Sequence, residues 1–146
     1  MAYDISADGR QVVAAEIAGA GGRRLWLVPL DRQSPPAPIP NIQGNNPFFG
    51  PRGEIIFRGF EGDLAFPYSV RADGTGLQKI GEAPIAGIKG ISPDRQWLVV
   101  RAPETDVRSA IVALSLRGEP QVRITAASSS SDEVDVVTSN GRRMGS

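Results

Sequence analysis

The chain has 146 residues, of which 40% are hydrophobic and 22% are charged, and its formal net charge is zero. This composition is typical of one packed, soluble fold, and zero net charge offers no global electrostatic support for a nucleic-acid or acidic-membrane partner. Cysteine and histidine are both absent, which excludes disulfides, zinc sites with the usual ligands, cysteine nucleophiles and histidine-based catalytic triads.

The first repeat, at about residues 3–40, is organised around the turn phrase Ser6-Ala7-Asp8-Gly9. Its expected strands are residues 3–6, 11–16 and 24–29. The proline-rich segment 34–40 comes next. Because proline cannot donate to a strand ladder, this segment suits an outer edge strand or no strand at all.

The second repeat, at about residues 41–84, follows the same plan. Its expected strands are residues 48–50, 54–58, 66–71 and 77–80. Pro51-Arg52-Gly53 forms the first turn, and residues 59–64 are expected to form a loop. Asp73-Gly74 predicts a hairpin turn, because glycine adopts a positive φ without a Cβ clash.

The third repeat, at about residues 85–125, has the turn Pro93-Asp94-Arg95 and an expected loop at 102–108. Its expected strands are residues 90–92, 96–101, 110–116 and 121–125. After Thr125 the repeat stops. Residues 126–146 are polar, with only Val134–Val137 strand-like, and we expect most of this C-terminal tail to be disordered.

Copies of one phrase recur at a nearly constant distance and predict the architecture. Gly50 lies 44 residues after Ser6, and Ser92 lies 42 residues after Gly50. A period of about 40–45 residues with short strands in each unit is typical of β-propeller blades. We therefore predict an all-β fold, a β-propeller fragment of three four-stranded antiparallel blades over residues 1–125.

Each blade contains a continuous apolar run, namely Val12–Ala15, Ile55–Phe57 and Trp97–Val100. A buried helix is the competing interpretation of such runs, but each run is short, rich in β-branched or aromatic residues, and bounded by turns. The runs predict strands that neighbouring blades cover on both faces. Trp26, Tyr68 and Trp97 are accordingly expected in the blade cores.

The turn phrases Ser6–Gly9 and Ser92–Asp94, each followed by an apolar strand, resemble the Ser-Pro-Asp-Gly hallmark of TolB-like, WD-like propeller repeats. The segments Leu25–Asp31 and Tyr68–Gly74 resemble the second hallmark, a strand that runs into the next turn. The blades are also similar to propeller regions of bacterial eukaryotic-like serine/threonine kinases and to stand-alone extracytoplasmic proteins. The resemblance implies a bacterial propeller without catalytic residues in these motifs.

The turn residues do not favour catalytic or metal-binding roles. Asp8, Asp73 and Asp94 are each isolated, whereas a calcium loop needs several oxygen ligands at alternate positions, and a turn aspartate commonly bonds its own backbone. Ser6 and Ser92 have no histidine to activate them. We predict no catalytic residue, metal site or cofactor, and assign structural turn roles to Ser6, Asp8, Gly9, Gly50, Pro51, Gly53, Asp73, Gly74, Ser92, Pro93 and Asp94.

The predicted blades favour a module for protein interaction or ligand sensing rather than an enzyme. Candidate contact residues lie in the expected inter-strand loops, where binding residues concentrate, namely Phe60, Glu61, Asp63 and Arg108. The partner is a protein or peptide of unidentified kind. Two alternatives stay open, the substrate-gating propeller of a prolyl-oligopeptidase-type hydrolase and a truncated product without a function of its own.

Three blades are fewer than the roughly four to eight that close a propeller ring. We therefore expect self-association of the chain or further blades in a longer parent protein. The first residues have neither the basic start nor the apolar run of a signal peptide, and no run approaches the roughly 18 apolar residues of a membrane span. We expect no membrane insertion, and the compartment stays unassigned.

Overall fold

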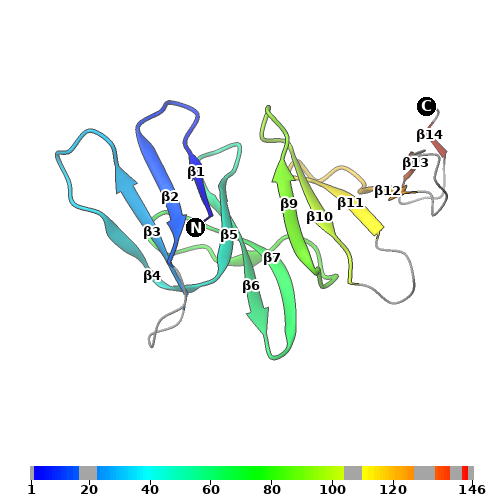
Figure 1. The fold of residues 1–146 in the computed structure, drawn as a ribbon, viewed down its shortest axis with the longest axis horizontal. Helices are drawn as coiled ribbons and strands as arrows, with labels where there is room; N and C mark the ends of the chain where they lie inside the picture. Colours follow the sequence, from blue (N-terminus) through cyan, green and yellow to red (C-terminus); the bar gives the residue numbers. More distant parts are fainter. Residues whose placement is uncertain (1, 17–22, 104–109, 127–133, 139–142, 145–146) are drawn as a thin grey trace. The chain divides into compact units, whose positions relative to one another are not determined.

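The computed structural model describes residues 2–16, 23–103, 110–126, 134–138 and 143–144. The described residues form β-strands in three antiparallel sheets (Figure 1), which confirms the all-β prediction. The chain divides into two compact units, Met1–Ala83 and Pro84–Ser146. None of the described residues belongs to a helix with the length and hydrophobicity needed to cross a membrane.

Sheet 1 contains the first repeat. Its strands pair in chain order and are β1 (Tyr3–Ile5), β2 (Gln11–Ala15), β3 (Arg24–Pro29) and β4 (Ala37–Gln43). The proline-rich segment forms the edge strand β4, in which Pro38 lies opposite Trp26. Proline is tolerated there because an edge strand needs backbone donors on one side only. Of the two alternatives for this segment, the edge strand is the one observed.

Sheet 2 contains the second repeat, with strands β5 (Asn45–Phe49), β6 (Ile55–Glu61), β7 (Leu64–Val70) and β8 (Gln78–Lys79). The prediction of a loop at 59–64 is wrong, because only Gly62 and Asp63 separate β6 from β7. Gly59 pairs with Phe66 inside the hairpin, and a Cβ on it would lie 2.7 Å from the Tyr68 ring. This glycine makes room for an aromatic ring within the sheet and does not mark a loop.

The core of the unit Met1–Ala83 lies between sheets 1 and 2. We call face A of a sheet the side that carries the last residue of its first strand (Ile5, Phe49 or Ile91), and face B the opposite side. Face B of sheet 1 packs on face A of sheet 2. The buried residues of this interface are Val13, Ala15, Leu25, Ile39 and Ile42 from sheet 1 and Phe49, Ile55, Phe57, Phe66, Tyr68 and Val70 from sheet 2.

One hydrogen bond also joins the two sheets. The carboxylate of Asp4 in β1 accepts the backbone N–H of Phe49 in β5 at 2.8 Å. A charged acceptor strengthens such a bond relative to a neutral one. The contact between sheets 1 and 2 is therefore both apolar and hydrogen-bonded.

Sheet 3 contains the third repeat and two additional strands. Its strands, again neighbours in chain order, are β9 (Gly87–Ile91), β10 (Trp97–Arg101), β11 (Ala110–Ser115), β12 (Val122–Ala126), β13 (Val134–Thr138) and β14 (Arg143–Met144). The first four strands have the predicted plan. The strand-like run in the tail is β13, paired with β12. Residues 127–133, 139–142 and 145–146, where disorder was expected, lie outside the described residues.

The apolar runs are fully buried in sheet 2 only. Residues Ile55–Phe57 are all buried, as predicted. In sheet 3, Leu98 and Val100 are buried, whereas Trp97 and Val99, which point to the other face, are half-buried. The difference arises because successive side chains of a strand point to opposite faces of the sheet, and the two faces have different surroundings.

The two tryptophans are not core residues. Trp26 and Trp97 are both half-buried, whereas Tyr68 is buried at 9% exposure. The prediction that all three rings are in the core is wrong for the tryptophans, because the register turns Trp26 to face A of sheet 1 and Trp97 to face B of sheet 3. The described residues leave both of these faces partly exposed.

Candidate contact surface

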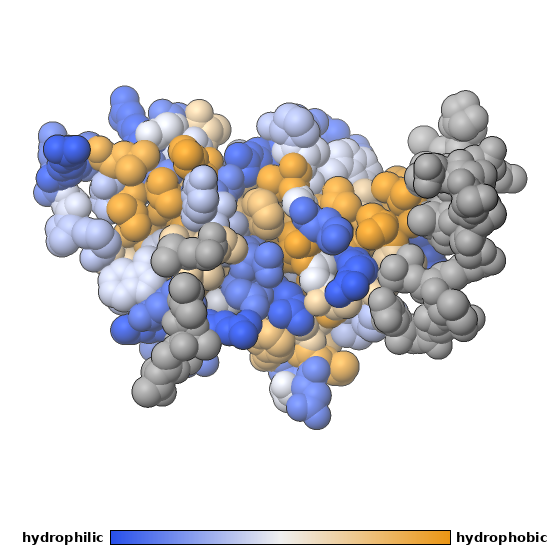
Figure 2. All heavy atoms as spheres, viewed as in Figure 1, coloured by the Kyte–Doolittle hydropathy of each residue, from blue (hydrophilic) through white to orange (hydrophobic). Residues whose placement is uncertain are grey.

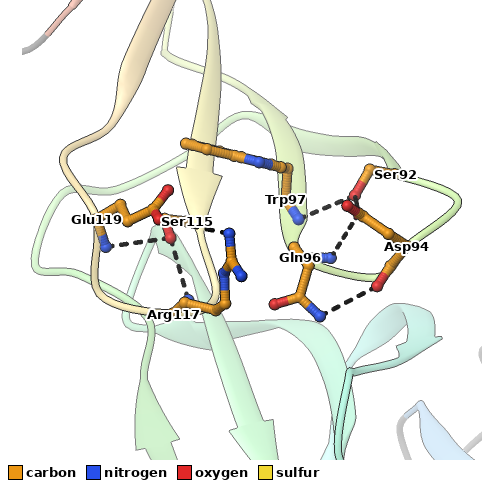
Figure 3. A network of polar contacts seen from close by, with 7 residues as sticks. All are labelled: Ser92, Asp94, Gln96, Trp97, Ser115, Arg117 and Glu119. Atoms are coloured by element: carbon orange, nitrogen blue, oxygen red, sulfur yellow. Dashed lines mark hydrogen bonds and ion pairs between the residues drawn. The ribbon is translucent and has the colours of Figure 1, made fainter.

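The Ser-x-Asp phrases of the first and third repeats fold into the same hydrogen-bonded turn. Ser6 Oγ donates to Asp8 Oδ1 at 2.6 Å, and Asp8 Oδ1 also accepts the backbone N–H of Arg10 at 2.9 Å. Ser92 Oγ donates to Asp94 Oδ1 at 2.6 Å, and the backbone N–H of Gln96 donates to the same carboxylate oxygen at 3.0 Å (Figure 3). Both carboxylates therefore organise backbone within their own turns.

These hydrogen bonds favour ionised aspartates. The serine hydroxyl, followed by the backbone N–H, holds the pKa of Asp8 and of Asp94 below its ordinary value. The hydroxyl and N–H of Thr75 lower the pKa of Asp73 in the same way, at 2.6 and 2.9 Å. Among the described residues, no three acidic, cysteine or histidine side chains gather to hold a metal ion.

The other predicted turn residues occupy the positions that their chemistry suits. Pro51 and Pro93 are the second residues of their turns, where a fixed φ near −65° is suitable. Gly9 and Gly53 close their turns with φ values of 72° and 81°. Arg95 takes this last position in the third repeat with a φ of 62°, a conformation that residues with a Cβ rarely adopt.

The second repeat builds its turn with a different side chain. Glu54 Oε1 accepts the backbone N–H of Arg52 at 2.8 Å, so a carboxylate again organises the turn, although its donor lies two residues before it and not two residues after it as for Asp8 and Asp94. The carboxylate lies against Gly50, in the space that a Cβ there would need. Glycine therefore replaces serine at position 50 because it leaves room for the carboxylate that organises this turn.

Gly50→Ala is expected to cost about 1 kcal/mol of unfolding free energy, because the methyl group displaces the Glu54 carboxylate from its hydrogen bond. In a Glu54→Ala background the same substitution should cost almost nothing. Urea unfolding of the double-mutant cycle measures this coupling. Strictly additive losses would contradict the explanation for Gly50.

The predicted contact residues gather at the tip of the β6–β7 hairpin. Phe60 and Glu61 are the last residues of β6, and Asp63 belongs to the two-residue turn. Phe60 is 48% exposed, and Leu64, which begins β7, is 53% exposed. Arg108, the fourth candidate, lies outside the described residues. Three of the candidates thus lie close together, two of them on a strand instead of in a loop.

Glu61 is the centre of a polar cluster beside this tip. Lys79 Nζ lies 2.8 and 2.9 Å from its two carboxylate oxygens, and the Tyr68 hydroxyl donates to it at 3.1 Å. The Lys79 ammonium, and then the Tyr68 hydroxyl, lower the pKa of Glu61, while the carboxylate raises the pKa of Lys79. Burial, followed by the bond to Glu61, raises the pKa of Tyr68. These shifts favour a charged pair beside a neutral phenol.

Two cations lie over aromatic rings of the same sheet. The guanidinium of Arg58 is 4.7 Å from the ring centroid of Phe60, and Lys79 Nζ is 4.1 Å from that of Phe66. Contacts of this kind contribute about 0.5–1 kcal/mol at exposed sites. They restrain the Phe60 ring and engage both cations within the sheet.

A small cavity opens between β4 and sheet 2. Its volume is ≈ 150 Å³, and it is lined by residues 41–43 together with Phe57, Gly59, Phe60, Tyr68 and Leu77. Phe57 and Tyr68 are stacked, with ring centroids 5.6 Å apart, and Leu77 is 51% exposed. The cavity is thus lined by both aromatic and polar residues, with the Phe57 and Tyr68 rings largely buried.

Sequence reasoning missed several neighbours of the predicted contact residues. Leu64 directly follows the turn and could have been found from its place in the hairpin. Lys79 lies 18 residues from Glu61 in the chain, and the pairing of Tyr68 with Lys79 brings it to the carboxylate. That proximity depends on the register of β7 and β8, which no local pattern in the sequence predicts.

No protein-family model matches the chain, and no curated protein matches it. Several solved structures are similar to it in fold, two of them as follows. One is TolB from Acinetobacter baumannii, with 11% sequence identity, a TM-score of 0.67, and coverage of 98% of this chain and 42% of TolB. The other is a protein assigned to TolB from Agrobacterium tumefaciens, with 15% identity, a TM-score of 0.63, and coverage of 98% and 63%.

These similarities establish the fold alone. The fold is similar to that of a TolB β-propeller, and each antiparallel sheet has the strand plan of a blade, as the repeat and the turn phrases predicted. This chain spans less than two thirds of either TolB structure.

Proposed function

We propose that this chain is a non-enzymatic β-propeller module that binds an apolar segment of a protein or peptide at the tip of the β6–β7 hairpin. The observation that carries the proposal is the exposure of Phe60 and Leu64 at that tip, at 48% and 53%. The two side chains point to opposite faces of the hairpin, because Phe60 pairs with Ala65 and Leu64 with Glu61. Each flanks the two-residue turn, and binding residues concentrate around such connecting segments.

The β6–β7 hairpin that carries the tip is regularly paired and largely buried. Its two strands pair without a bulge from Ile55 opposite Val70 to Glu61 opposite Leu64. Most of β7 is buried, namely Ala65, Phe66, Pro67, Tyr68 and Val70. A tip held in this way loses little conformational entropy when it binds, which favours affinity.

Glu61, Lys79 and Arg58 near the tip are engaged within the sheet, whereas Asp63 in the turn is exposed. Glu61 pairs with Lys79, and Arg58 lies over the ring of Phe60. What remains available to a partner is the apolar surface of Phe60 and Leu64, together with the Asp63 carboxylate. An aliphatic or aromatic side chain of the partner suits the apolar surface better than a charged one.

The chemistry of the turn serines supports binding rather than catalysis. Ser6 and Ser92 donate to their carboxylates, and each also accepts a backbone N–H at 3.0 Å. Their hydroxyl groups are therefore committed to the turns. A serine nucleophile needs a base that removes its proton, and ionised aspartates of lowered pKa are poor bases.

Panning a phage-displayed library of random peptides against the full chain tests this function. Peptides selected for binding should lose affinity about tenfold on Phe60→Ala, because removal of an anchor ring commonly costs more than about 1 kcal/mol. Leu30→Ala is the matched control, since Leu30 is 47% exposed and lies outside the hairpin. Failure to enrich any peptide, or peptides that are insensitive to both Phe60→Ala and Leu64→Ala, would contradict the proposal.

A further inference from the structure

Sheets 1 and 2 show which faces of neighbouring blades fit together. Face A of sheet 2 carries two ladders, Phe49–Ile55–Val70 and Phe57–Tyr68, and all five side chains are buried against face B of sheet 1. A single repeat cannot bury such a face by itself, so a neighbouring blade supplies the cover. Face A against face B is thus the established contact of this chain.

Face A of sheet 1 has the same ladders but lacks this cover among the described residues. The register places Ile5–Val12–Val28 and Ala14–Trp26 at the positions of the two buried ladders of sheet 2. Ile5 is 45% exposed, and Tyr3 on the same face is 63% exposed. Figure 2 shows apolar side chains gathered over the strands of sheet 1.

Face B of sheet 3 is the second partly open face. Val99 lies opposite Ala113, and Arg101 opposite Ile111, at the positions of the pairs Val13–Leu27 and Ala15–Leu25 on face B of sheet 1. All four of these residues of sheet 3 are half-buried. Trp97 lies on this face as well, and in Figure 3 its indole extends away from the Ser92–Asp94 turn.

The two tryptophans of the chain therefore lie on two faces of complementary kind. Trp26 is on face A of sheet 1, and Trp97 is on face B of sheet 3. Tryptophan is enriched among the residues that dominate binding energy at protein interfaces. The formal net charge of zero means that two copies of the chain have no overall charge repulsion to overcome.

We propose that face A of sheet 1 binds face B of sheet 3 in a second copy of this chain. The contact repeats the interface between sheets 1 and 2, which identifies the occupant as a blade rather than an extended peptide. Each copy has one face of each kind, so a closed dimer in which each copy offers both faces makes the contact twice. Together they supply six blades, within the range of about four to eight found in closed propellers.

Sedimentation velocity of the full chain over a range of concentrations tests the proposal. The chain should form dimers, and Ile5→Glu and Val99→Lys should each raise the dissociation constant at least about tenfold, because each replaces an apolar side chain of the contact by a charged one. Leu64→Glu is the matched control, since Leu64 is 53% exposed and lies on neither face's ladders. Far-UV circular dichroism verifies that each variant keeps the fold.

Mixing the two variants distinguishes this reciprocal contact from other modes of association. A dimer with one copy of each variant keeps one unaltered contact and joins the introduced carboxylate and ammonium groups in the other. The mixture should therefore dimerise more tightly than either variant alone. Emission from the tryptophans should shift to shorter wavelength as the dimer forms, because both indoles lose exposure.

A chain that stays monomeric at every concentration would overturn the proposal. So would open-ended assemblies, a dimer insensitive to Ile5→Glu, or sensitivity to Ile5→Glu without sensitivity to Val99→Lys. Peptide binding at the hairpin tip does not use these faces and should survive both substitutions. The two proposals can therefore fail independently.

Discussion

Phe57→Ala is expected to lower the free energy of unfolding by about 3–5 kcal/mol. The Phe57 ring is 2% exposed and stacks on Tyr68, with centroids 5.6 Å apart, in the core between sheets 1 and 2. Gly44 lies so close to the ring that a Cβ there would overlap it. Because small domains are stable by only about 5–15 kcal/mol, this loss should unfold a measurable fraction of the unit Met1–Ala83.

Phe60→Ala is the matched control for this substitution. Phe60 lies on the same strand but the opposite face and is 48% exposed, so its removal should cost less than about 1 kcal/mol, mainly the contact with Arg58. Urea unfolding in a Trp97→Phe background makes Trp26 the reporter for this unit. The chain concentration is held constant, because association adds to apparent stability. Equal losses for the two alanine variants would show that the two faces of β6 are assigned wrongly.

Gly74→Ala is expected to cost about 2–4 kcal/mol, the second largest of the predicted effects. Gly74 has a φ of 87°, and a Cβ there would lie 2.7 Å from the carbonyl oxygen of Pro40 in β4. The methyl group therefore meets both an unfavourable backbone conformation and the backbone of the neighbouring sheet. Thermal and urea unfolding measure the combined loss.

Gly9→Ala separates these two contributions. Gly9 has a φ of 72°, and a Cβ built on it meets no atom within 4 Å. Its substitution should cost about 1 kcal/mol from the left-handed conformation alone. A loss at Gly74 no greater than that at Gly9 would mean that sheets 1 and 2 separate easily at Pro40.

The sequence by itself determined the features that depend on a few neighbouring residues. The Ser6 and Ser92 phrases predicted their turns because serine, aspartate and the backbone donors that they bind lie within five residues of each other. The recurrence of these phrases then predicted three blades, since a supersecondary unit repeats when its local pattern repeats. The missing N–H donors of proline limited the segment 34–40 to an outer edge strand or no strand, and the structure shows the edge strand β4.

Such local patterns did not predict which side chains lie next to a residue from another strand. The loop predicted at 59–64 includes Gly59, yet this residue lies inside β6, where the Tyr68 ring needs its space. Gly50 departs from the turn phrase, and the Glu54 carboxylate that compensates for it is a feature of this turn alone. At both positions, a contact that forms only in the folded chain explains why the residue is glycine.

The tertiary structure alone decided which apolar residues are core and which are surface. Trp97 and Leu98 are adjacent in one apolar run, but the run did not reveal which face of the blade would be covered, and Leu98 is buried where Trp97 is only half-buried. The candidate site depends on the same kind of information, because Lys79 reaches Glu61 through the pairing of β7 with β8. A periodic sequence specifies that strands alternate their side chains between two faces, whereas the packing of one sheet on another determines which of those faces is removed from water.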